Sequence, residues 1–401
     1  MARILIDGRF VGVGDSQTRV VMQNLREILK LDRENKYTLL IRPQGIKEVG
    51  RYFGIGELDI NKLIRNSELE IKNLCVSILD VPHYSKDEQI KLLSHLNKEK
   101  FDLVHFTQFN HPILYRGRYI VTIQDLTLIG HLHYFNFIKQ LAFNMVMKSA
   151  IRDSTKIISI SKVTTEDILD FVDIEPKKIS LIYWGIDHNL FNLKAKDKSK
   201  IEQFKKKYGI KDEYFLYTGA WKKHKNLVRM LQAYEQYYQK SKVKKENPIQ
   251  LVLVGKIDKN EPEVVAEIER INKDLSALHG LPSAIIATGF IEDFELPTAY
   301  AGALCYVIPS LNEGFGWPPL EAMACGTPVI SSNVSCMPEI QGNASFYFDP
   351  YSIDEIAKAM EKVAANPRLQ AELREKGLKQ VQKYHWEDTA KKTLEVYKSL
   401  I

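Results

Sequence analysis

Residues 304–332 read LCYVIPSLNEGFGWPPLEAMACGTPVISS. The apolar run at 304–308 predicts a strand, and the loop after it contains two glycines. We expect a helix to begin near Pro318, because a proline is tolerated in a first turn, and to end at Gly326 before a second strand from Val329. A strand, a helix and a strand in this order predict a parallel sheet with helices packed on it.

Two carboxylates lie around the predicted N-terminus of this helix. Glu313 precedes the helix, and Glu321 is expected in its first turn. A helix N-terminus offers free backbone N–H groups and a positive dipole end, while Gly314 and Gly316 let a ligand approach the main chain closely. Because the carboxylates would repel a phosphate but accept hydrogen bonds from hydroxyls, a ligand with both hydroxyls and phosphates fits best. The alternative is a helix whose acidic residues only suit its dipole.

This stretch resembles the Glu-x7-Glu signature of the retaining glycosyltransferases of family 4, enzymes of the two-domain GT-B fold. The signature runs here from Glu313 to Glu321, with Pro309-Ser310 before it and Met323-Ala-Cys-Gly-Thr-Pro-Val after it. The resemblance implies that Glu313 and nearby backbone amides hold the transferred sugar and that Glu321 holds the nucleotide ribose. The donor-binding residues implied in this stretch are Ser310, Gly314, Phe315, Gly316 and Glu321.

The composition predicts two globular domains and no nucleic-acid surface. A chain of 401 residues is too long for one core, and 45% apolar residues suffice to bury two. The formal net charge of +6 equals that of residues 191–211, which hold eight lysines and two acids. We interpret this basic run as a solvated surface beside a linker, with contact to an anionic membrane as the alternative.

Four cysteines (Cys75, Cys305, Cys325 and Cys336) lack metal-ligand spacing and are expected to be reduced structural thiols. The N-terminus enters an apolar strand directly, without the regions of a signal peptide. No apolar run reaches the roughly 20 residues that a membrane span needs. These features predict a cytoplasmic protein, either free or peripheral on the inner face of the membrane.

Short apolar strands alternate with helical patterns along almost the whole chain, which predicts an α/β fold with two Rossmann-like doubly wound domains. In the first half we expect strands at 4–7, 37–42, 103–106, 120–123, 157–159 and 179–183. In the second half we expect them at 215–218, 250–254, 284–287, 306–308, 329–331 and 345–348. The pattern of residues 45–70 does not distinguish a helix from a strand.

The domain boundary is expected near 187–197, where the lysine-rich run begins. Residues 380–401 have helical periodicity but follow a complete second domain. In GT-B enzymes the last helix crosses back onto the first domain, and His385-Trp-Glu-Asp-Thr-Ala390 resembles the pattern at that crossing. The resemblance thus implies an acceptor-side domain of residues 1–190 with helix 385–401, a nucleotide-sugar donor domain of residues 191–384, and a cleft between them.

A basic cluster opens the second domain after a predicted strand. The run Gly219-Ala-Trp-Lys-Lys-His224-Lys225-Asn226 resembles the family's Arg/His-Lys-Asn element, whose lysine contacts the donor diphosphate. The resemblance assigns that role to Lys225, a compact charge suited to a leaving group, and places His224 at the family's arginine and Gly219 on the donor side. A solvated helix start is the alternative.

The nucleotide base has a candidate site after a later strand. Thr288-Gly-Phe290-Ile291 lies at the carboxyl edge, where open sheets bind ligands. Similar family members contact the base through backbone near this point, which assigns Phe290 and Ile291 to the donor. The alternative is that Phe290 is a core residue.

In the first domain, Gly12-Val-Gly14 stands where family members have a glycine-rich loop near the donor diphosphate. It lacks the third glycine and the acidic residue of a dinucleotide fingerprint, so a plain turn is the alternative. Gln124 stands where the family has a histidine close to the transferred sugar. The glutamine amide can hydrogen-bond a hydroxyl but cannot exchange a proton. The catalytic candidates are therefore Glu313, Lys225 and Gln124.

No metal and no cofactor are expected. The chain has no Asp-x-Asp pair of the kind that holds a divalent ion on the donor diphosphate, so Lys225 and the helix terminus should replace the metal. His131 and His133 form a His-x-His without other ligand types, and together with His105 and His111 they are interpreted as structural histidines.

A helical stripe in residues 134–152 contains Phe135, Ile138, Leu141, Ala142, Met145 and Ser149. We expect this stripe to pack in the core. The alternative is an acceptor-side surface that touches a membrane, since many relatives glycosylate lipid-linked acceptors.

The function implied is retaining transfer of a hexose, such as mannose or glucose, from a nucleotide-diphosphate sugar to a hydroxyl acceptor in glycan, polysaccharide or glycolipid synthesis. The acceptor could be a lipid-linked glycan. One alternative is a catalytically impaired nucleotide-sugar-binding partner subunit, which Gln124 motivates. The other is a different GT-B activity, such as that of a sugar epimerase or phosphorylase.

Overall fold

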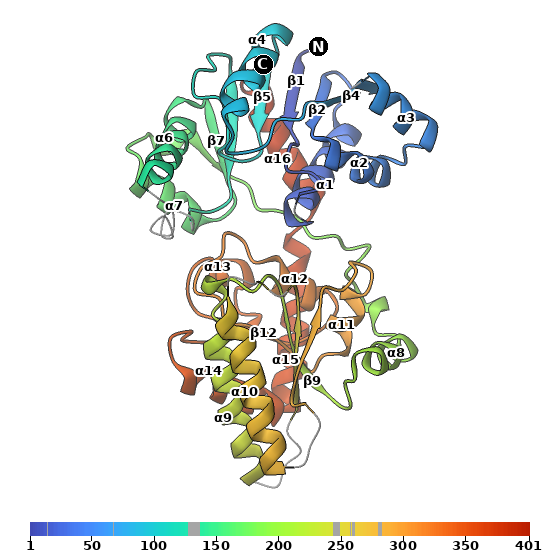
Figure 1. Cartoon of the computed structure of the whole chain (residues 1–401), viewed down its shortest axis with the longest axis vertical. Coiled ribbons are helices and arrows are strands. Elements are labelled where there is room, and N and C mark those ends of the chain that lie inside the picture. The colour runs from blue at the N-terminus through green and yellow to red at the C-terminus, as the bar shows by residue number, and fades with distance from the viewer. Residues whose placement is uncertain are drawn as a thin grey trace. The chain divides into compact units, whose positions relative to one another are not determined.

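The computed structural model describes residues 1–13, 15–66, 68–126, 137–243, 249–256, 258, 261–279 and 283–401. The chain divides into two compact units, one formed by Met1–Gly185 with His385–Ile401 and the other by Ile186–Tyr384 (Figure 1). The chain passes from the first unit to the second between residues 185 and 186, whereas the sequence predicted this boundary between 190 and 191. It returns to the first unit between residues 384 and 385.

The described part of the first unit contains an eight-stranded sheet in the order β3-β4-β2-β1-β5-β6-β7-β8. Neighbouring strands are parallel, except that β3 and β4 are antiparallel. The strands are β1 (Arg3–Asp7), β2 (Lys36–Ile41), β3 (Glu68–Ile71), β4 (Leu74–Ile78), β5 (Leu103–Phe106), β6 (Tyr119–Ile123), β7 (Lys156–Ser159) and β8 (Ile179–Leu181). The order reverses between β1 and β5, so the switch point of this sheet lies beyond the carboxyl ends of those two strands.

Helices cover both faces of this sheet. They are α1 (Asp15–Leu31), α2 (Ile46–Phe53), α3 (Glu57–Asn66), the π-helical turn η2 (Glu88–Leu92), α4 (Leu93–Glu99), α6 (Phe137–Asp153), α7 (Lys162–Phe171) and α16 (Trp386–Lys398), with short 3-10 turns at η1 (Pro43–Gly45) and η4 (Pro176–Lys178). Ile4 and Ile6 of β1 belong to one buried apolar cluster, whereas Leu5 belongs to another. A strand buried on both faces reads as a continuous apolar run, which is why the sequence predicts these strands well.

The C-terminal helix α16 packs against α1 in the first unit, where it is drawn in red among blue and cyan elements (Figure 1). Its Ala390, Leu394 and Tyr397 complete the apolar cluster around Ile4. The Thr389 hydroxyl also donates a 2.9 Å hydrogen bond to the Tyr183 carbonyl. This placement confirms the expected return of the last helix to the first domain.

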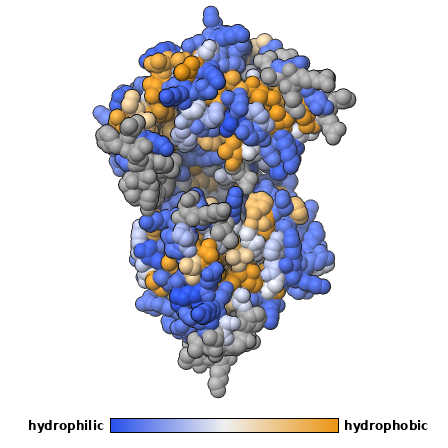
Figure 2. Space-filling model, viewed as in Figure 1, coloured by the Kyte–Doolittle hydropathy of each residue, from blue (hydrophilic) through white to orange (hydrophobic). Residues whose placement is uncertain are grey.

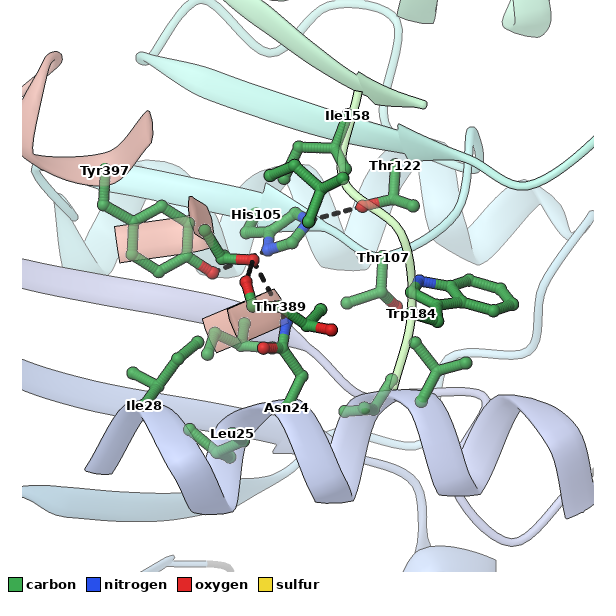
Figure 3. A pocket seen from close by; sticks show the side chains of 15 residues that line it. Asn24, Leu25, Ile28, His105, Thr107, Thr122, Ile158, Trp184, Thr389 and Tyr397 are labelled. Atoms are coloured by element: carbon green, nitrogen blue, oxygen red, sulfur yellow. Dashed lines mark hydrogen bonds between the residues drawn. The ribbon is translucent and has the colours of Figure 1, made fainter. Parts of the chain in front are cut away.

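A cavity of about 20 Å³ lies between α1, α16 and the sheet (Figure 3). His105 sits at its wall, with Nδ1 2.7 Å from the Tyr397 hydroxyl and Nε2 2.8 Å from the Thr122 hydroxyl. Burial lowers the pKa of His105 to about 3, so its ring is neutral at pH 7. His105 is therefore a structural histidine, as expected, and it connects α16 to the sheet.

Of the other three histidines that were expected to be structural, the structure describes His111. The ring of His111 lies 3.0 Å from the Phe109 carbonyl and 3.2 Å from the Ser149 hydroxyl, in agreement with the expectation. His131 and His133 lie outside the described residues.

A buried ion cluster shapes the loop after β1. The guanidinium of Arg9 donates from Nη2 to Asp7 at 2.8 Å and from Nη1 to Glu88 of η2 at 3.1 Å. The Arg9 side chain has no exposed surface, and those of Asp7 and Glu88 are 4% and 2% exposed. One cation therefore lies between two carboxyl groups that are almost completely buried.

The described part of the second unit contains a six-stranded parallel sheet in the order β11-β10-β9-β12-β13-β14. Its strands are β9 (Tyr214–Thr218), β10 (Gln250–Val254), β11 (Ile285–Gly289), β12 (Cys305–Ile308), β13 (Val329–Ser332) and β14 (Ser345–Phe348). The order reverses between β9 and β12, and the crevice at the carboxyl ends of such strands is where open α/β sheets bind ligands. The observed architecture confirms the predicted α/β class with two doubly wound domains.

The helices of this unit connect the parallel strands. They are α8 (Lys198–Tyr208), α9 (Leu227–Val243), α10 (Pro262–His279), α11 (Leu296–Gly302), α12 (Trp317–Ala324), α13 (Met337–Gln341), α14 (Ile353–Ala364) and α15 (Pro367–Gln380), with 3-10 turns at η5 (Leu193–Ala195), η6 (Lys223–Lys225) and η7 (Val381–Lys383). No helix among the described residues is both long and apolar enough to span a membrane. The four cysteines are free thiols, as expected.

Three local predictions were wrong. Strands β3 and β4 were not predicted, because β3 is a short edge strand in which acidic and apolar residues alternate, within a pattern that could also be helical. Helix α12 begins at Trp317, so Glu321 lies in its second turn and no acidic residue lies in the first. Thr288 and Gly289 lie inside β11 and do not follow it.

The predicted core stripe of α6 was also wrong. Leu141 and Met145 are 52% and 54% exposed, while Met147, Ala150 and Ile151 are buried. Both faces of α6 carry apolar residues, so the helical periodicity does not single out the buried face. Phe135 lies outside the described residues.

Candidate active site

The candidate site lies at the switch point of the second sheet, where β9 and β12 end side by side. Gly219 follows β9 with a φ of 145°, and Gly255 follows the adjacent β10 with a φ of 149°. A Cβ atom on Gly255 would lie 2.0 Å from the Gly219 carbonyl oxygen, so glycine is required at this close contact of two backbones. The two glycines therefore let the chain segments that follow β9 and β10 lie against each other.

The loop after β12 and the basic turn η6 are joined by backbone and side-chain hydrogen bonds. The Leu311 N–H donates to the His224 carbonyl at 2.8 Å. Asn226, buried and in the left-handed conformation with a φ of 59°, donates to the carbonyls of Pro309 at 3.1 Å and Pro350 at 2.7 Å. These bonds fix the basic cluster against the glutamate-bearing loop.

Lys225 and Glu313 form an ion pair at this junction. The Lys225 Nζ lies 2.6 Å from Glu313 Oε1, and the Ser310 hydroxyl donates to the same oxygen at 2.7 Å. The two side chains are 20% and 13% exposed. Burial alone would raise the pKa of Glu313, but the charge and hydrogen bond of Lys225 outweigh it, so its pKa lies below the usual value. Glu313 is therefore a carboxylate at pH 7.

Glu321 is held by a second set of partners. It is 4% exposed, and Oε2 accepts a 3.0 Å hydrogen bond from the Tyr300 hydroxyl. The Tyr300 hydroxyl lies 2.7 Å from the Thr218 hydroxyl at the end of β9, and Tyr306 of β12 donates to the Thr218 carbonyl at 3.2 Å. The two tyrosines thus connect Glu321 to the two strands at the switch point.

The N-terminus of α12 offers fewer free N–H groups than the N-terminus of a helix without prolines. Pro318 and Pro319 lack an N–H, so Trp317 has the only one among the first three helical residues. Gly316, with a φ of 80°, is the N-cap, and a Cβ atom there would lie 2.5 Å from the Met337 methyl carbon. The amides available to a ligand are therefore mainly those of the loop from Gly314 to Gly316.

The chain matches two families, one mainly in the first unit and one in the second. Residues 200–380 match the family described as Glycosyl transferases group 1, and residues 72–190 match the family described as Glycosyltransferase Family 4. Together the two matches cover 300 of the 401 residues, so the chain is similar to the group 1 and family 4 glycosyltransferases over most of its length. The family resemblance of the Glu313–Glu321 stretch is thereby confirmed.

Named relatives of this chain include mannosyltransferases. The Serotype-specific mannosyltransferase WbdA of Escherichia coli is 30% identical over 246 residues, which cover 61% of this chain and 29% of the relative. The O-antigen chain mannosyltransferase B of the same organism is 32% identical over 187 residues, 47% of this chain and 46% of the relative. An uncharacterized glycosyltransferase of Methanocaldococcus jannaschii is 26% identical over 79% of this chain and 80% of its own. The matches to the two Escherichia coli relatives span less than half of their length.

Two solved structures show the same fold over the whole of this chain. Sucrose-phosphate synthase from Thermosynechococcus elongatus superposes with a TM-score of 0.71 at 19% identity, covering 100% of this chain and 99% of its own. Anabaena Alr3699/HepE in complex with UDP and glucose superposes with a TM-score of 0.68 at 17% identity, covering 100% of both chains.

Most of the predicted donor-side residues lie in the second unit. The structure brings Ser310, Lys225 and Glu313 into contact. Phe315 is buried and packs against Trp317 and Tyr384, so only its backbone can reach a ligand. Within the described residues, no three His, Cys, Asp or Glu side chains are grouped so that they could hold a metal ion.

The predicted base-side residues Phe290 and Ile291 differ in burial. Phe290 is 57% exposed, so the alternative that it is a core residue was wrong. Ile291 is 3% exposed, which leaves only its backbone for a ligand.

The remaining predicted residues belong to the first unit. Gln124 follows β6, and its side chain pairs with Gln17 of α1. Gly14 lies outside the described residues, while Gly12 precedes it with a φ of 80°. Sequence reasoning missed Gln17 and the Tyr300–Thr218 network, because these residues are distant in the chain from the groups they support and lie in no motif.

Proposed function

We propose that this chain transfers a hexosyl group from a nucleoside-diphosphate sugar to a hydroxyl acceptor with retention of anomeric configuration. The observation that carries this proposal is the Lys225–Glu313 pair at the switch point, where Nζ and Oε1 are 2.6 Å apart. A cation for the diphosphate and a carboxylate for sugar hydroxyls lie within reach of one ligand. The relatives named mannosyltransferases support a hexose as the group transferred.

The pair is suited to exchange its partners when a donor binds. The diphosphate competes with Glu313 for Lys225, and Glu313, released from its cation, accepts hydrogen bonds from the sugar hydroxyls. As the glycosidic bond to the diphosphate breaks, negative charge grows on the leaving phosphate, where Lys225 and the Gly314–Gly316 amides stabilise it. Positioning and leaving-group stabilisation then account for most of the rate enhancement.

The experiment that tests this proposal is a screen of nucleoside-diphosphate hexoses, first for thermal stabilisation and then for transfer. A donor at 100 times its dissociation constant adds about 2.7 kcal/mol to the free energy of unfolding. We expect one donor to stabilise the chain and to release its nucleoside diphosphate, slowly to water and faster to a hydroxyl acceptor. Stabilisation without any release would support a binding subunit, and the absence of any stabilising donor would refute the proposal.

We propose that the reaction needs no divalent metal, since Lys225 supplies positive charge at the candidate diphosphate site. The rate of nucleoside-diphosphate release is therefore expected to be unchanged in excess EDTA. Loss of the rate in EDTA, with recovery on addition of magnesium or manganese, would contradict this prediction.

We propose that Glu321 holds the ribose, because its carboxylate is buried and held by Tyr300. Glu321→Ala is then expected to weaken binding of the free nucleoside diphosphate about tenfold, as expected for a hydrogen bond to a charged group, whereas Glu313→Ala should mainly lower turnover. Isothermal calorimetry measures both affinities. Equal affinity of the wild type and Glu321→Ala for the free diphosphate would refute the ribose assignment.

For the acceptor we propose a lipid-linked glycan reached by peripheral contact with a membrane. The exposed Leu141 and Met145 share α6 with the exposed Lys139 and Lys148, and apolar and hydrophilic residues are interspersed on this side of the first unit (Figure 2). Lysines attract anionic headgroups while apolar side chains insert between them. Sedimentation with anionic vesicles should fall in Leu141→Ser/Met145→Ser, and unchanged sedimentation would exclude this surface.

A further inference from the structure

Gln17 and Gln124 form a reciprocal pair of side-chain amides in the first unit. Gln17 Nε2 donates to Gln124 Oε1 at 2.5 Å, and Gln124 Nε2 donates to Gln17 Oε1 at 2.6 Å. The residues are 107 positions apart, so the fold alone brings them together. Each amide has two N–H groups and two acceptor lone pairs, and the pair uses one of each. Among the described residues, one N–H group and one lone pair of each amide have no partner, and both side chains are only half-buried.

Further hydrogen bonds hold the chain next to each glutamine. The Gln124 carbonyl accepts a 3.2 Å hydrogen bond from the Thr164 hydroxyl in the first turn of α7. Thr164 is itself fixed, because its N–H donates to the N-cap Ser161 at 3.1 Å. On the other side, the hydroxyl of Thr18, next to Gln17, accepts a 2.9 Å hydrogen bond from the Gly12 N–H. The chain is therefore fixed next to both glutamines.

The orientation of each amide depends on the other. If one amide rotated by half a turn, N–H would face N–H and carbonyl would face carbonyl, and both bonds would be lost. A histidine at position 124 could present at most one ring nitrogen in the same plane and would leave one polar atom of Gln17 unmatched. Gln17 thus determines where Gln124 presents its remaining N–H and carbonyl groups.

The chemistry of the exposed groups selects a class of ligand. They are neutral and include both donors and acceptors, which suits sugar hydroxyls, because each hydroxyl both donates and accepts. A phosphate, which only accepts, would be repelled by the carbonyl oxygens. Gln124 directly follows β6, at the carboxyl edge of the first sheet. This is the edge at which open sheets bind ligands.

We propose that Gln17 is a positioning residue that holds Gln124 as one half of a two-amide site for sugar hydroxyls. The proposal rests on the proposed function, since it takes the sugar from the donor or the acceptor of that reaction. Either source presents the same neutral hydroxyls, and the experiment below distinguishes them.

The first measurement tests the pair without any ligand. Gln17→Met, Gln124→Met and the double variant are unfolded thermally, with the exposed Gln44→Met of the same unit as the control. Each single variant is expected to lower Tm by about 2 to 4 °C, and the double variant by no more than one of them. Additive losses would show that the pair does not form in solution and would overturn the proposal.

The second measurement compares affinities and rates, using the nucleoside-diphosphate hexose with the largest stabilisation in the screen. If the amides hold the donor sugar, Gln17→Met weakens binding of this donor by about tenfold and leaves the affinity for the free nucleoside diphosphate unchanged. If they hold the acceptor, the rate of transfer to the acceptor falls about tenfold while release to water is unchanged. A merely structural pair would change none of these quantities, and that result would overturn the proposal.

The donor affinities also separate this proposal from the proposed function. If the wild type binds the nucleoside-diphosphate hexose more tightly than the free nucleoside diphosphate but never transfers the sugar, the proposed transfer is refuted. The two-amide site would still be supported if Gln17→Met lost this difference in affinity. Gln124→His is expected to reproduce the loss seen in Gln17→Met. A gain of transfer in Gln124→His would instead overturn the role of the pair and support the impaired-subunit alternative.

Discussion

Replacing Lys225 with methionine is expected to lower the single-turnover rate of sugar transfer by about 10² to 10³-fold. This is the usual cost of removing one preorganised group that stabilises charge in a transition state, roughly 3 to 4 kcal/mol. Lys225 is 20% exposed and its Nζ lies 2.6 Å from Glu313 Oε1, and a methionine at this position supplies no positive charge. Rapid-quench measurement of nucleoside-diphosphate release at saturating donor gives this rate directly.

The variant changes Glu313 as well, and a second variant separates the two effects. Without Lys225, burial raises the pKa of Glu313, and the opposing effects of Ser310 and His224 are smaller than that of burial. The double variant Lys225→Met/Glu313→Gln removes the uncompensated carboxylate, so it should be more stable than Lys225→Met while remaining as slow. Lys222→Met is the matched control, since Lys222 belongs to the same basic cluster but pairs with Asp258 and is half exposed. A rate within a factor of three of wild type in Lys225→Met would refute its role at the leaving group.

The sequence predicts the framework of this protein because the framework depends on local patterns. Parallel strands buried on both faces appear as short apolar runs, and nearly all the strands described in both sheets were expected within a few residues. The exceptions have a physical reason. Strand β3 lies at the edge of the sheet and alternates Glu68, Leu69, Glu70 and Ile71, a pattern that short helices also produce.

The residues of the candidate site were likewise predictable only where they lie in a local motif. Glu313 and Lys225 could be named from contiguous motifs, yet their contact joins residues 88 positions apart and follows only from the order of β9 and β12. Tyr300 lies in no motif that we recognised. Its role follows from the contact between α11 and α12, which brings its hydroxyl to Glu321. The two prolines of α12 were visible in the sequence, but their effect on the available N–H groups required the observed start of the helix at Trp317.

Replacing Arg9 with methionine is expected to lower the free energy of unfolding of the first unit by about 3 to 5 kcal/mol. The cause is the pair of carboxylates left behind, because Asp7 and Glu88 are both almost completely buried. Burial already raises the pKa of Glu88 despite the contact with Arg9, whereas Arg9 outweighs burial at Asp7 and lowers its pKa. Chemical denaturation followed by circular dichroism measures the loss.

Two further variants test whether the missing counter-charge is the cause. Asp7→Asn/Arg9→Met/Glu88→Gln removes all three charges and should be more stable than Arg9→Met, since no buried charge is left unpaired. Arg42→Met is the control, because Arg42 pairs at 3.0 Å with Asp80, which is 61% exposed, and such a pair is worth about 0 to 1 kcal/mol.

The pH dependence of the stability of Arg9→Met provides a separate test of whether buried charge causes the loss. In Arg9→Met the pKa values of both carboxyls should lie above their unfolded values, so the destabilisation is present at pH 7 and is relieved as pH falls through the raised values towards the unfolded ones. The stability difference between wild type and Arg9→Met should therefore be smaller at pH 5 than at pH 7. A difference that does not change over this range would show that Arg9 acts through packing alone. Because Arg9 lies in the loop that leads to Gly12 and Gln17, the variant should also weaken the coupling between Gln17 and Gln124.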